Sequence, residues 1–125
     1  MGVKISGSKE AIRSLKVFTN TAALRRVVQP AMTMAAEAMM SDAKRRTPVD
    51  TGRLRASGRV ERARTTGTRV VVVLGFHTKY AGYVHEDLNA NHPVGQAKFL
   101  ALAVKGGKAD MERAIANAIE KEMKK

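Results

Sequence analysis

The residues best suited to chemistry are the imidazole and carboxylate side chains of His77, His85, Glu86, Asp87 and His92. Such groups can bind a metal ion or transfer protons. Their spacing argues against both roles, because no second His follows His85 at the four-residue interval that places two imidazoles on one helical face. The chain also has no Cys to supply thiolate ligands. We therefore expect no catalytic residue, no metal site and no cofactor.

Motifs for nucleophilic catalysis and nucleotide binding are missing as well. Ser57 lies in a predicted strand without the glycines of a nucleophile elbow. The glycines of the chain form neither a Walker loop nor a dinucleotide-binding fingerprint. The sequence thus predicts a protein that is not an enzyme.

The charge balance is the strongest functional signal, with 23 Lys and Arg against 11 Asp and Glu and a formal net charge of +12. Self-repulsion of this size favours an anionic partner. Much of the excess falls in one segment, which contains Lys44, Arg45, Arg46, Arg53, Arg55, Arg59, Arg62 and Arg64. Arg53, Arg55 and Arg59 are the candidates for contact with DNA phosphate or an acidic protein surface. A basic face that is merely solvated is the simpler alternative.

Length and composition limit the architecture. The 125 residues allow one domain, spanning residues 1–125, with one modest core. Trp is absent and only two Tyr and three Phe are present, so the core is thin and burial against other subunits could supply part of the stability. No apolar run has membrane-spanning length and no signal peptide is recognisable. We expect synthesis in the cytoplasm of the producing cell and no membrane association.

The first half of the chain shows one strong periodicity. Gly2 to Ser6 is predicted to be a short strand, and Ser8 to cap a helix that begins at Lys9. Apolar residues at steps of three and four predict a long helix from about Ala22 to Arg46. Pro30 lies inside it, so we expect a kink or a restart there. The Met residues of this helix are predicted to fill irregular apolar gaps.

The second half alternates between strand and helix patterns. Residues 54–60 predict a strand with a cationic outer face, and residues 70–74, apolar on both faces, predict its more central hairpin partner. One or two helical turns (residues 80–86), a surface loop (87–95), a helix from Phe99 interrupted at Gly106-Gly107, and a final helix (109–123) should follow. The predicted class is α+β: a small antiparallel sheet with a β-hairpin packed against a long helix, plus N- and C-terminal helices.

A corner joins the long helix to the first hairpin strand. Pro48 disfavours helical geometry at Thr47 and should end the helix. Asp50 and Thr51 can bond their own backbone in a turn, and Gly52 can adopt positive φ. The sequence therefore predicts a sharp turn that directs the cationic strand.

The order of these motifs resembles the neck and tail-completion proteins that join head to tail in long-tailed double-stranded-DNA bacteriophages. The resemblance is carried by Pro-Val-Asp-Thr-Gly followed by Arg-Leu-Arg-x-Ser, by the segment Tyr80 to Glu86, and by Phe99-Leu100. Where many relatives have a Glu-Phe-Gly-Thr-like run, this chain has His85-Glu86-Asp87-Leu88. The resemblance implies a structural virion protein that assembles into a ring, expected to be a hexamer, between the head-side connector and the tail.

The same resemblance suggests which residues contact other subunits. These candidates lie in the later motifs and the loop between them: Tyr80, Tyr83, His85, Glu86, Asp87, His92 and Phe99. Neighbouring connector and tail proteins, and non-specific contact with phage DNA, are the other expected partners. Two other functions remain open, a small basic nucleic-acid-binding domain and, less favoured, a phage-encoded nuclease.

Overall fold

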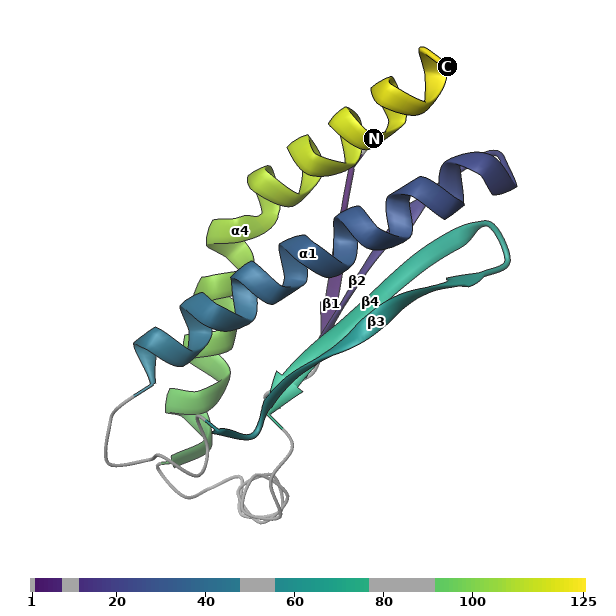
Figure 1. Cartoon of the computed structure of the whole chain (residues 1–125). Coiled ribbons are helices and arrows are strands. Elements are labelled where there is room, and N and C mark those ends of the chain that lie inside the picture. The colour runs from purple at the N-terminus through teal and green to yellow at the C-terminus, as the bar shows by residue number, and fades with distance from the viewer. Residues whose placement is uncertain (1, 8–11, 48–55, 77–91) are drawn as a thin grey trace.

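The computed structural model describes residues 2–7, 12–47, 56–76 and 92–125. Four antiparallel strands form one sheet in the order β1-β2-β4-β3. The two long helices among these residues, α1 (Ala22–Arg46) and α4 (His92–Met123), lie on the same side of this sheet (Figure 1). The predicted α+β class, with a hairpin packed against a long helix, is confirmed.

Helix α1 begins and ends where the sequence predicts. The hydroxyl of Thr21 accepts a hydrogen bond from the backbone N–H of Leu24 at 3.1 Å, which caps the N-terminus. Thr47 has the extended backbone, φ −77° and ψ 132°, that a following proline favours. The helix continues through Pro30 without a restart. Pro48 and the rest of the predicted corner, residues 48–52, lie outside the described residues.

The N-terminal segment corrects one prediction. Residues 12–18 form a strand, β2 (Ile12–Phe18), instead of a helix. The predicted first strand is present as β1 (Lys4–Gly7), and it pairs with β2. Ser8, the predicted helix cap, lies outside the described residues. Leu15 and Val17 are fully buried, whereas the Phe18 side chain is 49% exposed. Pairing of this segment with β4 favours an extended backbone over the helix that local spacing allows.

The hairpin is confirmed with a shifted start. Strand β3 runs from Gly58 to Thr66 and β4 from Arg69 to Phe76, so β3 begins four residues later than predicted. Gly67 closes the turn with φ 63°, a conformation that favours glycine. Strand β4 lies between β2 and β3, which agrees with its prediction as the more central partner.

Helix α4 corrects two further predictions. It starts at His92, so residues 92–95 belong to a helix and not to the predicted loop. It also continues through Gly106 and Gly107, where an interruption was predicted. A Cβ added at Gly107 would lie 2.7 Å from Cγ of Met39 in α1. Close approach of the two helices therefore requires a glycine here, and their packing compensates for its low helix propensity.

The core is a single layer between the helices and the covered face of the sheet. The sheet contributes alternate residues, and each helix contributes one stripe. The fully buried members with the largest side chains are Phe76, Leu15, Met32, Leu74, Leu100, Met111, Ile115, Val17, Val28, Val70, Val72 and Val104. The backbone N–H of Val3 also donates to Glu112 Oε2 at 2.9 Å, which joins the N-terminus to α4.

Candidate nucleic-acid and subunit interfaces

The sheet has one covered face and one open face. Along β4, Val70, Val72 and Leu74 are buried against the helices, while the intervening Val71 and Val73 are partly exposed. The described helices contact the sheet from one side only (Figure 1). The alternation of a strand thus places every second residue on a surface that no described helix or strand covers.

Cations from all four strands gather on this open face. Strand alternation and register place five there, Lys4 from β1, Lys16 from β2, Arg69 from β4, and Arg59 and Arg64 from β3. We call these five residues the open cationic face. Among the described residues of that face, Glu61 is the one carboxylate.

The strand register brings like charges together. Lys4 lies directly opposite Lys16 in the β1–β2 pair. Val71 lies between Lys16 of β2 and Arg64 of β3, which are therefore about 10 Å apart at the backbone. Arg69 is two residues from Val71 along the same strand, so the cations surround a small apolar centre.

Polar contacts of these cations involve no carboxylate within the described part of the chain. Lys4 Nζ lies 5.6 Å from the centroid of the Phe18 ring, within the range of a cation–π contact. Arg59 Nη1 donates to the backbone oxygens of Ala56 at 2.8 Å and Gly58 at 3.1 Å. Every described ion pair lies instead in α1, in α4 or in the two residues that follow α4.

One more arginine of the sheet lies on the covered side. Arg13 is opposite Leu74 in the register, and its Nη1 donates to the backbone oxygen of Ile12 at 3.0 Å. Burial lowers the pKa of the Arg13 guanidinium from its ordinary value. This side chain is therefore separate from the open cationic face.

Three of the predicted site residues lie in the part of the chain that the structure describes. Arg59 is exposed on β3, Phe99 is half-buried in α4, and the backbone of His92 begins α4. The remaining predicted contacts lie outside the described residues: Pro48, Asp50, Thr51, Gly52, Arg53, Arg55, Tyr80, Tyr83, His85, Glu86 and Asp87.

Sequence reasoning missed Lys4, Lys16 and Arg69 as members of the cationic surface. Lys16 was assigned to a helix, so its place beside Lys4 on a sheet could not be inferred. The available signal was the alternation of Leu15 and Val17 with polar residues, which matches the two-residue period of a strand.

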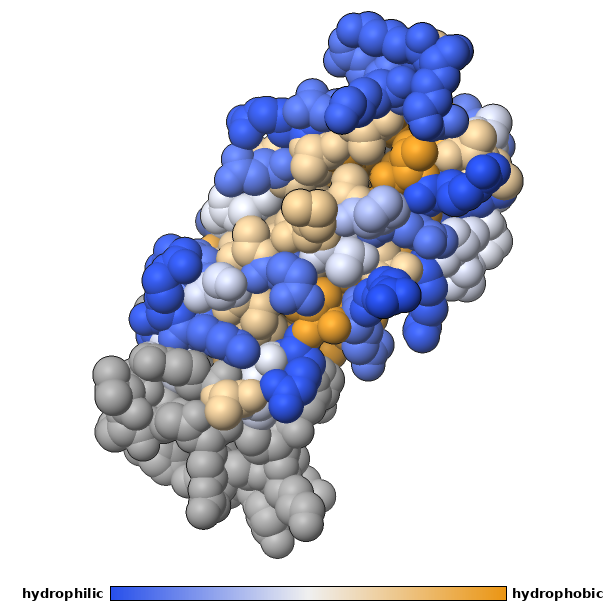
Figure 2. Space-filling model, in the orientation of Figure 1, coloured by the Kyte–Doolittle hydropathy of each residue, from blue (hydrophilic) through white to orange (hydrophobic). Residues whose placement is uncertain are grey.

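The side of the molecule formed by α1 and α4 differs from the open cationic face because it exposes apolar side chains. Figure 2 shows apolar atoms over α1 and α4 between hydrophilic regions. Among the described side chains of these helices, three large apolar ones are exposed: Met34 at 74%, Leu102 at 40% and Met123 at 75%. A groove of about 250 Å³ also lies between the helices, lined by Ala35, Ala38, Met39, Asp42, Arg45, Ala103, Gly106, Gly107 and Asp110.

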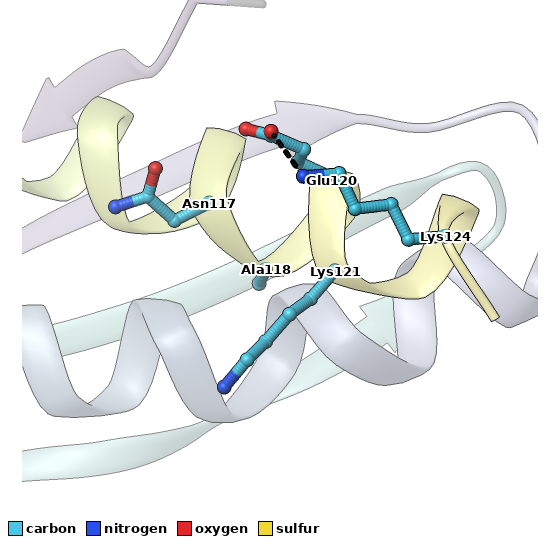
Figure 3. A pocket seen from close by; sticks show the side chains of 5 residues that line it. All are labelled: Asn117, Ala118, Glu120, Lys121 and Lys124. Atoms are coloured by element: carbon cyan, nitrogen blue, oxygen red, sulfur yellow. Dashed lines mark ion pairs between the residues drawn. The ribbon is translucent and has the colours of Figure 1, made fainter.

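A shallow pocket lies near the C-terminal end of α4. Its volume is about 530 Å³, and it is lined by Asn117, Ala118, Glu120, Lys121 and Lys124 (Figure 3). Glu120 is paired with Lys124 at 3.1 Å. Over residues 2–7, 12–47, 56–76 and 92–125, no three His, Asp or Glu side chains could hold a metal ion. In the same part of the chain, neither helix is long and apolar enough to cross a bilayer.

Comparison with known families identifies the class of protein. Residues 9–86, more than half of the 125-residue chain, match the HK97-gp10-like family, described as "Bacteriophage HK97-gp10, putative tail-component". The chain belongs to this family of phage tail components, in agreement with the resemblance noted from its motifs. Comparison with curated proteins returns no match, and neither does comparison with solved structures.

Proposed function

We propose that this chain is a non-enzymatic subunit of the virion neck, where copies of it form a closed ring, expected to be a hexamer, between the head-side connector and the tail. Membership of a family of tail components is the observation that carries the proposal. The ring would surround the path by which DNA leaves the head. Tyr80, Tyr83 and the 85–87 segment stay candidate subunit contacts.

The exposed apolar side chains of the helical side support assembly. A cyclic ring joins one surface of each subunit to a different surface of the next, so every subunit is buried twice. Met34 is 74% exposed in the middle of α1, where burial by a neighbour would remove a large apolar side chain from water. We therefore propose that this part of α1 lies in the ring interface.

Two measurements test the ring and its place. The mass of the purified protein in solution should correspond to a closed oligomer, and the protein should be present in purified virions. Met34→Glu should reduce the oligomer to monomers without loss of folding, because the charge would have to be buried at the interface. Thr68→Glu, at the exposed hairpin turn, is the matched control and should leave the oligomer intact.

The opposite results would contradict the proposal in separable ways. Absence of the protein from virions would refute the neck assignment. A protein that remains monomeric at all concentrations and in particles would refute the ring. If Met34→Glu leaves the oligomer unchanged, this part of α1 does not lie in the interface, and the proposal of a ring still stands.

A free-standing nucleic-acid-binding domain is the second candidate, and the open cationic face favours it. That function predicts monomers or dimers that bind DNA in a salt-dependent way and do not enter the virion. A nuclease would need the His85 and Glu86 segment, which lies outside the described residues. Metal-dependent DNA cleavage that is lost on changing both residues would favour the nuclease over either other function.

A further inference from the structure

We propose that the open cationic face binds the phosphate backbone of duplex DNA without reading its sequence. This inference deepens the proposed function by naming the partner of one surface, and it rests on that function only for where in the virion the DNA is met. The binding itself is a property of the subunit and can be measured on purified protein.

The arrangement of charge on the open cationic face opposes folding. Like charges directly opposite each other on neighbouring strands destabilise a sheet, yet Lys4 lies opposite Lys16. Lys16 and Arg64 lie on either side of Val71, Arg69 lies two residues before Val71 in β4, and none of these cations has a carboxylate partner among the described residues. An external polyanion would convert this repulsion into attraction.

The cations of α4, unlike those of the open cationic face, are accompanied by a similar number of acidic residues. That helix carries five Lys or Arg and four Asp or Glu, so its charges are nearly balanced. Arg113, for example, contacts Asp110 at 2.8 Å. Solubility alone would be served by mixed charges of this kind, and the segregation of cations on the sheet therefore calls for a specific anionic partner.

The composition of the open cationic face favours DNA over an acidic protein. Cores of protein–protein interfaces are enriched in aromatic residues, Met and Arg but depleted in Lys and in charge as a whole. The open cationic face has Lys4 and Lys16 beside its three Arg, and its exposed aromatic ring, Phe18, lies beneath Lys4 Nζ. Long, flexible Lys and Arg side chains around a small apolar centre are suited instead to a regular row of phosphates.

The width of the sheet excludes base reading by this surface. Four strands span about 14 Å between the outer two, which exceeds the width of about 12 Å of the DNA major groove. A surface of this width would lie across the groove and contact the backbones on its two sides. Contacts to phosphate carry no direct sequence information, so mixed-sequence duplexes should bind alike.

The test compares two triple variants that each remove three positive charges. The first is Lys16→Gln, Arg64→Gln and Arg69→Gln on the open cationic face. The control is Lys105→Gln, Lys108→Gln and Lys121→Gln on exposed positions of α4 that have no described ion pair. Binding of the full chain to short mixed-sequence duplexes is measured by fluorescence anisotropy over a range of salt concentrations, and folding of each variant by circular dichroism.

We expect the sheet variant to lose affinity for DNA on the order of 100-fold at about 0.15 M salt. The slope of the logarithm of the binding constant against the logarithm of the salt concentration should fall in magnitude by about 2.7, which corresponds to three lost phosphate contacts. The helix control should lose only a few-fold. Lys16→Arg, Arg64→Lys and Arg69→Lys together should retain both affinity and slope.

Several results would overturn the inference. Equal losses in the two triple variants would mean that net charge, and not this face, governs binding. Absence of binding by the unmodified protein at low salt would remove DNA as the partner, and binding to polyglutamate that needs the same three cations would then assign the face to an acidic protein. If the sheet variant fails to fold, Lys4→Gln serves instead, with an expected slope decrease of about 0.9; an unchanged slope would refute the proposal. None of these results alters whether the protein is found in virions.

Discussion

The two faces of the sheet carry different kinds of residue on the same strands. On the covered face, Val70, Val72 and Leu74 are fully buried, and their strand packs against α1. On the open face, the same stretch of β4 carries Arg69, Val71 and Val73, with Lys16 and Arg64 opposite Val71. The covered face gains stability from burial of apolar area, whereas the open face places like charges side by side. The covered face therefore maintains the fold, whereas the open face has a composition that folding does not favour.

The charges of the two helices are arranged differently from those of the open cationic face. Asp42, Asp110, Glu120 and Glu122 form ion pairs with nearby cations, such as Arg46 Nε with Asp42 Oδ2 at 3.1 Å and Lys124 Nζ with Glu120 Oε1 at 3.1 Å. Exposed pairs of this kind contribute little to stability, but they neutralise charge locally. The open cationic face has no described equivalent. The two sides of the molecule therefore have the properties of different interfaces, an apolar one with Met34 on the helices and a cationic one on the sheet.

The largest expected effect comes from placing a carboxylate on each face of β4. Val72→Asp should lower the free energy of unfolding by roughly 3 to 5 kcal/mol, because a charge would be buried without a partner. Val71→Asp, one residue away, should cost about 1 kcal/mol or less, since Lys16 and Arg64 flank the new carboxylate and only strand propensity is lost. Urea denaturation of both variants measures the difference. Equal losses would mean that the two faces are not distinct.

A smaller effect on stability separates the adjacent glycines Gly106 and Gly107 of α4. Gly107→Ala should lower the free energy of unfolding by about 1 to 2 kcal/mol, because the new Cβ would lie 2.7 Å from Met39 Cγ and the helices would be overpacked. Gly106→Ala should raise it by up to about 1 kcal/mol through helix propensity, as nothing lies within 4 Å of its Cβ position. Thermal unfolding of the pair tests this directly. A loss on Gly106→Ala would indicate that the helix is interrupted at this point.

Local patterns predicted those elements whose period was unambiguous. The spacing of apolar residues in α1 and the Thr47-Pro48 boundary gave both the existence and the end of that helix. The segment Ile12 to Phe18 was ambiguous, since Ile12 and Leu15 fit a helical step while Leu15 and Val17 fit a strand. Pairing with Val70 and Val72 decides the structure. A short segment cannot reveal such a distant partner, and tertiary pairing overrode the local preference.

The sequence predicts that the candidate site is a cationic strand surface, but it does not predict which other strands contribute residues to it. The charge and spacing around Arg59 indicated a strand with a cationic outer face, and Arg59 is exposed on β3. Lys4, Lys16 and Arg69 belong to the same face only because the order β1-β2-β4-β3 brings their strands together. A bulge between Glu61 and Arg64 also shifts the β3 register, and the backbone N–H of Ala63 within it donates to Thr33 Oγ1 of α1 at 3.0 Å. Contacts of this kind, between residues distant in the chain, are not encoded in a local period.

The smallest expected effect bears most directly on the open face. Lys16→Glu replaces a like-charged cross-strand pair by an opposite-charged one, because Lys4 lies opposite. The free energy of unfolding should rise by about 0.2 to 1 kcal/mol, and the gain should shrink at high salt as the charges are screened. Lys108→Glu on α4 is the matched reversal and should give a small loss, since it places a carboxylate four residues before Glu112.

Thermal unfolding at low and high salt measures both variants, and the anisotropy assay measures their affinity for duplex DNA. A variant that is more stable and binds DNA more weakly would show that the charge of Lys16 serves binding at the expense of the fold. If Lys16→Glu destabilises the protein at low salt, Lys4 and Lys16 do not repel each other across the strands. The charge arrangement of the open cationic face then does not oppose folding and no longer supports DNA as its partner. If it stabilises the protein and leaves DNA affinity unchanged, the repulsion is real but its purpose is not contact with DNA.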